Sequence, residues 1–335
     1  MKIIYSPKHA EHIPPFEIFN GNQEPHAEVP DRIENIRTAL VNDLRLKIET
    51  PRRISVSDII AVHDSDYVEY LSRSQKELNN NYIYPSVFSY EIEAQLAVNP
   101  IALRGRYSFD MYTPINQCTY TAALASASCA LSAARIVRSG EKNAYALCRP
   151  PGHHAEPARM GGYCYFNNAA IAAHYLSHHG KVAVLDVDFH HGNGTQRIFY
   201  ERSDMLTISL HADPLQKFPF FTGFANEIGI GRGRGYNFNF PMPLGTTDEH
   251  FQKTLDKAIR LVRKFKPHYL VVPVGFDTHE KDPIGGFKLI TNYYRQMART
   301  INNLNLPTVI IQEGGYNTKL LGKNAVSFVS GFLNK

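Results

Sequence analysis

Two aspartates and a histidine occupy alternate positions where an apolar stretch of the sequence ends. Residues 182–185, VAVL, have the continuous aliphatic character of a strand covered on both faces, and Asp186, Asp188 and His190 follow at once. If the chain stays extended, alternate side chains point to the same face, so two carboxylates and an imidazole would converge on one cation. A lone D-x-D pair is more often a solvated strand end. Here the continuation HHGNG favours a metal site.

Three other predicted strands end in similar polar clusters. PGHH follows residue 148, GFDTH follows residue 274, and EGGY follows residue 312. In α/β proteins the carboxyl ends of parallel strands line one crevice, which would collect all four clusters. Asp277, added to Asp188 and His190, makes an Asp, His, Asp set. Three protein ligands leave a position open for water, as catalytic zinc sites require.

A site of this kind predicts hydrolysis. The ion would acidify its bound water and polarise a carbonyl group. The adjacent His153 and His154 are the candidate base and acid, and Tyr316, behind two glycines, is the candidate donor to a developing oxyanion. Each residue alone has an ordinary structural explanation, such as a surface histidine, a helix cap or a turn. Their joint occurrence at successive strand ends favours the catalytic interpretation.

Strands that alternate with helices must position these clusters. Apolar stretches predict strands at 2–5, 144–148, 182–185, 206–210, 269–274 and 308–312, and apolar periodicity predicts helices at 31–44, 57–71, 120–139, 169–179, 195–202, 249–265 and 289–304. The alternation predicts an α/β fold with a mostly parallel sheet. Residues 7–30 and 79–116 are predicted loops, and a loop as long as the second is usually functional or a contact surface. No internal repeat or linker divides the chain, so residues 1–335 are expected to form a single domain.

Composition narrows the class of protein. With 335 residues and 43% hydrophobic content, the chain can bury a large core. It has no run of eighteen apolar residues and no signal-peptide pattern at its start, which predicts a cytoplasmic protein that does not enter a membrane. The four cysteines form no C-x-x-C pair and are expected to be reduced. The net charge of +5 is spread along the chain, and its densest group, Arg104, Arg106, Arg232 and Arg234, is too modest to predict nucleic-acid binding.

Six motifs carry a family resemblance: RPPGHHA at 149–155, GGYCYFNNAAIA at 161–172, LDVDFHHGNGT at 185–195, ISLHAD at 208–213, GFDTHEKDP at 275–283 and EGGY at 313–316. In this order they resemble the histone deacetylase superfamily, and more closely its acetylpolyamine amidohydrolase branch. The resemblance implies the arginase/deacetylase fold, a mostly parallel sheet of about eight strands with helices on both faces. It also implies one zinc ion per chain, with Fe²⁺ as a possible replacement.

The matching motifs imply roles for individual residues. Asp188, His190 and Asp277 correspond to the zinc ligands, His153 and His154 to the histidine pair, and Tyr316 to the oxyanion tyrosine. Asp186 would orient His153. The resemblance also implies a structural potassium site, formed by Asp186, Asp188, His190, Ser209 and Leu210.

The resemblance extends to the second histidine and the substrate channel. Asn193 stands where many eukaryotic deacetylases have an aspartate, and the loss of that charge should lower the pKa of His154. In the channel, the Gly162 carbonyl would accept the substrate amide N–H, and Tyr163 and Phe218 would form aromatic walls. Ile284 is a further expected contact, and Glu17, with Asp110 beside it, is a candidate partner for a distal ammonium, although either carboxylate could be an ordinary surface charge.

The resulting hypothesis is a zinc-dependent deacetylase that hydrolyses small acetylated amines, acetylpolyamines first. The long loop at 79–116 is expected to build a homodimer and to narrow the channel mouth. A protein or peptide acetyl-lysine deacetylase is the runner-up. A two-manganese ureohydrolase would need more carboxylates than these motifs supply, and the intact His153, His154 and Tyr316 argue against a non-catalytic binding protein.

Overall fold

The computed structural model describes residues 1–88 and 103–333, and its centre is one parallel sheet. Eight strands pair side by side in the order β4-β1-β5-β10-β9-β6-β7-β8, and every pairing is parallel. The strands are β1 (Lys2–Ile4), β4 (Ile48–Glu49), β5 (Asn143–Ala146), β6 (Val182–Asp186), β7 (Met205–Ala212), β8 (Asn237–Met242), β9 (Tyr269–Val274) and β10 (Thr308–Gln312). The expected α/β fold with a parallel sheet of about eight strands is confirmed.

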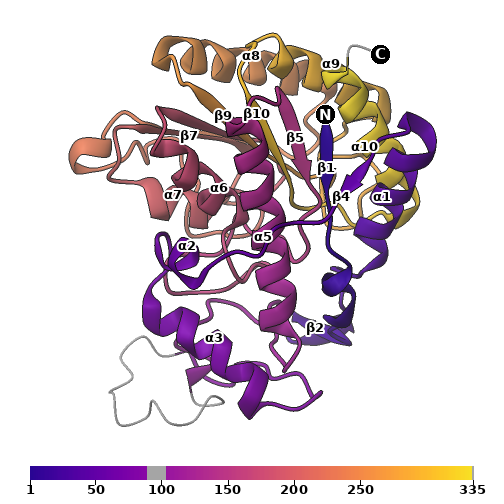
Figure 1. The fold of residues 1–335 in the computed structure, drawn as a ribbon, viewed down its shortest axis with the longest axis vertical. Coiled ribbons are helices and arrows are strands. Elements are labelled where there is room, and N and C mark those ends of the chain that lie inside the picture. The colour runs from indigo at the N-terminus through magenta and orange to yellow at the C-terminus, as the bar shows by residue number, and fades with distance from the viewer. Residues whose placement is uncertain (89–102, 334–335) are drawn as a thin grey trace.

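Helices cover both faces of the sheet because successive strand residues point to opposite sides. Val184 belongs to one buried cluster with α2 (Val56–Ile60), α3 (Ser65–Glu77), α5 (Thr119–Arg138) and α6 (Asn168–Ser177). Its neighbours Ala183 and Leu185 belong to the other cluster, with α1 (Asp31–Leu44), α8 (Asp248–Phe265), α9 (Thr291–Asn302) and α10 (Thr318–Phe332). In Figure 1, α5 crosses in front of the strands, and α8 and α9 run along the top of the view.

Helix α5 is the one described helix that is long and apolar enough to cross a membrane by length and composition. Fifteen of its residues are buried, and it packs against α6, β5 and β10. Its alanine-rich surface allows this close approach to the sheet. Gly140 follows its C-cap with φ +113°, a conformation that glycine adopts without strain. These contacts make α5 a core helix.

Several parts of the fold differ from the sequence prediction, and one of them is the two-residue strand β4, which was not predicted. The predicted loop 7–30 contains the 3₁₀ helix η1 (Pro7–Glu11) and an antiparallel hairpin, β2 (Phe16–Phe19) with β3 (Asn22–Pro25), which turns at Asn20 and Gly21 with positive φ angles. The predicted helix 57–71 is two helices, α2 and α3. Strand β8 and helix α10 were not predicted. Part of the predicted loop 79–116 lies outside the described residues.

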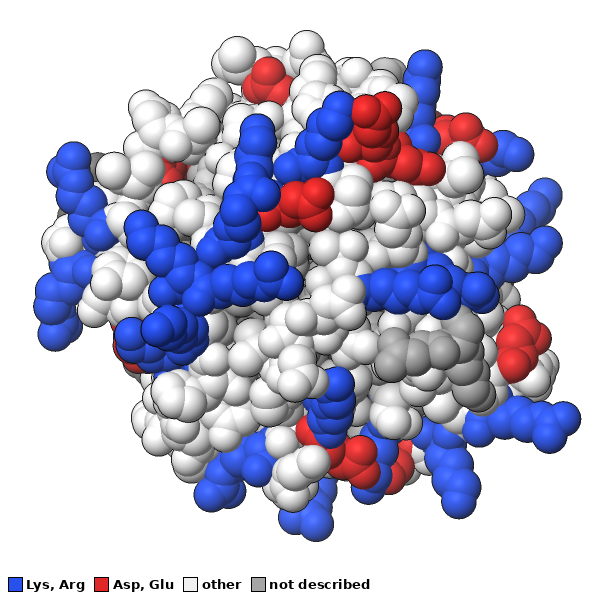
Figure 2. All heavy atoms as spheres, turned by 90° about the horizontal axis from the view of Figure 1, so that it is seen from above, with Lys and Arg blue, Asp and Glu red and all other residues white. Residues whose placement is uncertain are grey.

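In the view of Figure 2, lysines and arginines predominate, and several lie side by side left of the centre with few acidic side chains among them. Arg104, which was counted in the densest basic group, is fully buried and donates to the carbonyl of Thr113. The four cysteines are free thiols, and all but Cys118 are buried. The free thiols agree with the expectation of reduced cysteines.

Candidate active site

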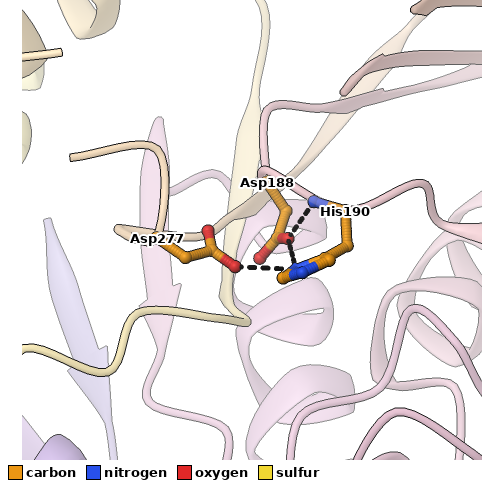
Figure 3. A group of neighbouring side chains, drawn as sticks. All are labelled: Asp188, His190 and Asp277. Carbon is orange, nitrogen blue, oxygen red and sulfur yellow. Dashed lines mark hydrogen bonds and ion pairs between the residues drawn. The ribbon is translucent and has the colours of Figure 1, made fainter. Parts of the chain in front are cut away.

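The carboxyl ends of β6 and β9 bring Asp188, His190 and Asp277 together (Figure 3). The Nδ1 atom of His190 lies 3.0 Å from the Oδ2 atom of Asp277 and 3.5 Å from the Oδ1 atom of Asp188. One ligand atom from each residue lies within 4.8 Å of the others, and all three residues are buried. In the described part of the chain this is the one group of three such residues able to hold a metal ion.

Backbone amides and glycines fix the two carboxylates. Gly314 N–H donates to Asp188 Oδ2 at 2.8 Å, and Phe189 N–H donates to Asp277 Oδ1 at 3.2 Å. A Cβ atom at Gly275 would lie 1.9 Å from Asp188 Oδ2, and one at Gly314 would lie 2.4 Å from Asp277 Oδ2. The carboxylates therefore pack directly against the backbone of Gly275 and Gly314, where a side chain on any other residue would overlap them.

The charges of the cluster suit a divalent cation. Burial, then the nearby Asp188 charge, raises the pKa of Asp277 to about 7. Burial opposes protonation of His190, but hydrogen bonds to Asp188 and Asp277 outweigh it and raise the pKa of His190 to about 9. Without a cation, protons on Asp277 and His190 offset the repulsion between the Asp188 and Asp277 carboxylates. A bound cation would offset the same repulsion. Two carboxylates and one imidazole nitrogen form a donor set that fits zinc or iron.

Asp186 does not belong to this cluster, although it shares the alternation with Asp188 and His190. Its Oδ2 atom instead lies 2.9 Å from His153 Nδ1, and its Oδ1 atom accepts the Asp188 N–H at 3.0 Å. Burial disfavours the charged form of His153, yet the charges of Asp188 and Asp186 outweigh burial and raise the pKa of His153 to about 10. The first histidine of the pair is therefore held as an imidazolium.

His154 has a neutral partner. Its Nδ1 atom lies 2.7 Å from Asn193 Oδ1, at the first residue of helix α7 (Asn193–Phe199). Burial, and then the neighbouring His153 and His190, lower the pKa of His154 well below 6.5. The direction is the expected one, but its causes are burial and the two neighbouring histidines, whereas the hydrogen bond to Asn193 acts to raise the pKa of His154. His154 is neutral at physiological pH.

The sequence analysis assigned no role to Glu313, the first residue of the EGGY motif. Its buried Oε2 atom accepts the N–H groups of Gly152 at 2.6 Å and His153 at 3.1 Å, so it anchors the turn that carries the histidine pair. Burial raises the pKa of Glu313 to about 8, although the charge of His153 acts to lower it. A glutamate placed directly after the predicted strand at 308–312 was the signal available in the sequence.

Tyr316 follows β10 and packs between Arg32 and Tyr163. Its backbone N–H donates to Asp282 Oδ2 at 2.7 Å, and the guanidinium of Arg32 lies 4.7 Å from the centre of its ring. Tyr163 packs beside it with ring centroids 5.6 Å apart. Burial raises the pKa of the Tyr316 phenol well above 10, which keeps the hydroxyl protonated and able to donate.

Four of the predicted channel residues are neighbours. The Phe218 ring stands edge-on to His154 with centroids 4.9 Å apart, and Gly162 has φ +54° with no room for a Cβ atom, which would lie 2.3 Å from the His154 ring. Tyr163 donates its hydroxyl to Glu17 at 2.8 Å. Glu17 is buried, so the alternative of a solvated surface charge does not hold for it.

Asp110 is committed to the protein backbone. Its two carboxylate oxygens accept the N–H groups of Gly162 and Tyr112 and the hydroxyl of Thr113. Burial raises the pKa of Asp110 to about 6. Through these hydrogen bonds Asp110 shapes the turn at Gly162, and its expected contact with a distal ammonium stays a prediction.

The remaining predicted residues lie around the cluster at different depths. Ser209 is buried on β7, pairs in register with Asp186, and lines with it a small polar cavity of about 10 Å³. Leu210 is fully buried in the core. Ile284 is partly exposed on the loop after β9, where its carbonyl accepts the ammonium of Lys217 at 3.3 Å.

Comparison with known proteins extends over nearly the whole chain. A model of the histone deacetylase domain matches residues 26–332. Acetylpolyamine amidohydrolase 1 of Pseudomonas aeruginosa is 38% identical over 341 residues, which cover 99% of both chains. Acetylpolyamine amidohydrolase of Burkholderia pseudomallei is 40% identical over 340 residues, covering 99% of this chain and 98% of the relative. A crystal structure of acetylpolyamine aminohydrolase from Burkholderia pseudomallei superposes with a TM-score of 0.95 at 39% identity, covering 99% of this chain and 98% of that chain.

Proposed function

The chain belongs to the histone deacetylase family, and from this membership we propose that it hydrolyses the amide of small acetylated amines, acetylpolyamines first, to acetate and a free amine. The observation that carries the proposal is the buried Asp188, His190 and Asp277 cluster next to two histidines with different partners. The proteins that it resembles over nearly their full length are named for acetylpolyamine hydrolysis.

Asp188, His190 and Asp277 would hold the metal, which we propose is one zinc ion, with Fe²⁺ as the alternative. When bound, the ion supplies Lewis acidity, which polarises the substrate carbonyl and acidifies a water molecule. The histidines lie beside this cluster: His153 Nε2 is 3.8 Å from Asp188 Oδ1, and the His154 and His190 ring centroids are 6.0 Å apart. Proton transfer and charge stabilisation are then left to the side chains of the protein.

The two histidines divide the proton chemistry. Neutral His154 would take the proton of the attacking water and afterwards deliver it to the departing amine. His153, whose charged form is favoured by Asp188 and Asp186, would stabilise the negative charge that develops on oxygen in the transition state. The neutral phenol of Tyr316 would donate a hydrogen bond to the carbonyl oxygen as it becomes an oxyanion.

The channel residues favour a slender, cationic substrate. We propose that the rings of Tyr163 and Phe218 enclose an alkyl chain, that the Gly162 carbonyl accepts the amide N–H, and that Ile284 lies nearer the mouth. Glu17, buried at the far side of Tyr163, offers a carboxylate for a distal ammonium, whose charge also gains attraction from aromatic faces. An acetyl-lysine side chain has the same reacting group without a free distal ammonium, which makes protein deacetylation the second candidate.

Two further parts of the proposal concern structure. Asp186, Asp188, His190, Ser209 and Leu210 would hold a structural potassium ion, and the polar cavity beside Asp186 and Ser209 supports this placement. Residues 79–116 would mediate a homodimer and narrow the channel mouth. In the described part of this segment, Val87 and Phe88 are exposed apolar side chains suited to such a contact.

Turnover of N-acetylputrescine, N-acetylspermidine, N-acetylcadaverine and an acetyl-lysine peptide, measured side by side, tests the substrate proposal. We expect the acetylated amines to have the higher kcat/KM. Glu17→Gln should lower kcat/KM for N-acetylputrescine by about tenfold, with little effect on an uncharged N-alkylacetamide of equal length. A preference for the peptide would favour protein deacetylation. Urea release from arginine or agmatine with about two manganese ions per chain would favour a ureohydrolase.

A further inference from the structure

A carboxylate lies directly behind the asparagine that contacts His154. Glu156 follows the histidine pair by two residues and is buried at 5% exposure. Its Oε1 atom accepts Asn193 Nδ2–H at 3.2 Å, and its Oε2 atom pairs with Arg159 at 2.7 Å. His154 is therefore linked to a negative charge through one intervening amide, and neither Glu156 nor Arg159 touches the metal cluster in the contacts described above.

The surroundings of the Asn193 amide define which of its ends faces His154. Its NH₂ group donates to the backbone carbonyl of His154 at 3.3 Å and to Glu156 at 3.2 Å, which uses both of its hydrogens. Its oxygen lies 2.7 Å from His154 Nδ1. The reversed amide would place its oxygen against a carbonyl oxygen and a carboxylate, and would lose both hydrogen bonds.

The backbone of Asn193 is held without help from Glu156. Its N–H donates to His191 O at 2.8 Å, and the next two residues, Gly194 and Thr195, donate their N–H groups to His153 O. Gly194 also packs so closely that a Cβ atom would lie 2.1 Å from Ala155 O. A substitution at Glu156 therefore acts on the side chain of Asn193 and leaves the turn in place.

Solvent lies close to this arrangement. Glu156, Arg159 and Asn193 line a surface pocket of about 420 Å³, together with residues of α7. Water from this pocket could satisfy either end of the amide, so hydrogen bonding alone does not require a charged group at position 156. A carboxylate, which only accepts hydrogen bonds, selects one orientation of the amide.

We propose that Glu156 is a positioning residue for His154: its carboxylate holds the Asn193 amide with the oxygen toward His154, which keeps the proton on Nδ1 and leaves Nε2 as the basic nitrogen. This inference rests on the proposed amidohydrolase function, because it assigns the basic nitrogen of that reaction. It differs from a purely structural role in which Glu156 serves only to pair with Arg159.

The proposal is tested by exchanging the carboxylate of Glu156 and the amide of Asn193 between the two positions. Glu156→Gln should lower kcat about tenfold with KM unchanged, because the introduced amide can turn its oxygen toward Arg159 or toward Asn193 but not toward both. Asn193→Asp should lower kcat by a similar factor, because it places two carboxylates about 3 Å apart. In the double variant the new amide donates to the new carboxylate, which still accepts from His154 Nδ1. The His154 carbonyl loses its donor, so kcat should recover only to within about fivefold of wild type.

Arg159→Met is the matched control, because it removes the ion pair and keeps the carboxylate on Asn193; its kcat should stay within about threefold of wild type. Losses that multiply in the double variant, or an Arg159→Met loss equal to that of Glu156→Gln, would overturn the proposal.

A second readout does not depend on activity. In ¹⁵N-histidine NMR spectra, His154 should show the Nδ1–H tautomer in wild type and in the double variant, and a mixture in Glu156→Gln. An Nε2–H tautomer in wild type would overturn the inference even in an active enzyme. An Nδ1–H pattern in a protein that hydrolyses no acetylated amine would instead reject the proposed function and leave the positioning role intact.

Discussion

The two adjacent histidines at the carboxyl end of β5 have similar burial and opposite electrostatic surroundings. His153 hydrogen-bonds directly to a carboxylate, Asp186. His154 hydrogen-bonds to the amide of Asn193, and Asn193 in turn donates to the carboxylate of Glu156. The pKa of His153 is raised to about 10, although burial acts against it, and burial lowers the pKa of His154 well below 6.5. Nearby carboxylate charges therefore favour the charged form of His153, whereas burial and the neighbouring histidines favour the neutral form of His154 within the same dipeptide.

The largest effect is expected from a substitution in the proposed metal site, which lies beside both histidines. Asp277→Ala removes one of three ligands and should lower kcat by at least about 10⁴-fold with loss of bound metal, while the fold is retained. Metal analysis, circular dichroism and acetate release together measure this. Asp213→Asn, at the end of β7 and outside the cluster, is the control and should keep its metal. Full metal content in Asp277→Ala would remove Asp277 from the site.

The second prediction separates the two histidines. His154→Ala should lower kcat by about 10³- to 10⁴-fold, because the neutral base also delivers the proton to the leaving amine. His153→Ala should cost about 10²-fold, since it removes a charge that stabilises the transition state but does not carry the proton. Steady-state kinetics at saturating metal measures both values. Equal losses would mean that the pair acts as one unit and that its difference in partners has no catalytic consequence.

The sequence predicted the parts of this site that follow from local patterns, and it did not predict contacts between residues far apart in the chain. The strand ends were predictable, because each aspartate or histidine directly follows an apolar run, and Asp277 could be added to Asp188 and His190 from that pattern alone. Asp186 shares the same alternation but contacts His153, which follows β5, and β10 and β9 lie between β5 and β6 in the sheet. Glu156 and Glu313 act on residues that the chain brings together only in three dimensions, so their roles required the structure.

The same distinction holds for the fold. Continuous apolar strands and alanine-rich α5 were predicted because both faces of a parallel sheet are buried. The hairpin of β2 and β3 was missed although Asn20 and Gly21 are a strong turn signal. Strand β8 lies at the edge of the sheet. Its alternating asparagines and phenylalanines have the period of a strand, but they stand between a glycine-rich run at 229–235 and two prolines, and the strand was missed.

The third prediction concerns a variant that gives His154 a carboxylate partner, as His153 has, and its expected effect is the smallest. In the double variant with Asn193→Asp and Glu156→Gln, His154 gains a carboxylate that favours its protonated form and raises its pKa. Since the base must be neutral, the acidic limb of the kcat/KM profile should move upward by about one pH unit. Activity near pH 8 should stay within about fivefold of wild type. An unmoved acidic limb would show that this limb does not report His154.

The most direct test of the central claim is acetate release from N-acetylputrescine by metal-depleted protein titrated with Zn²⁺. We expect no release after chelation, recovery that saturates near one equivalent of zinc per chain, and a loss of about 10²- to 10³-fold in Tyr316→Phe at full zinc content. Release that is unaffected by chelation, or a Tyr316→Phe variant as active as wild type, would contradict the account.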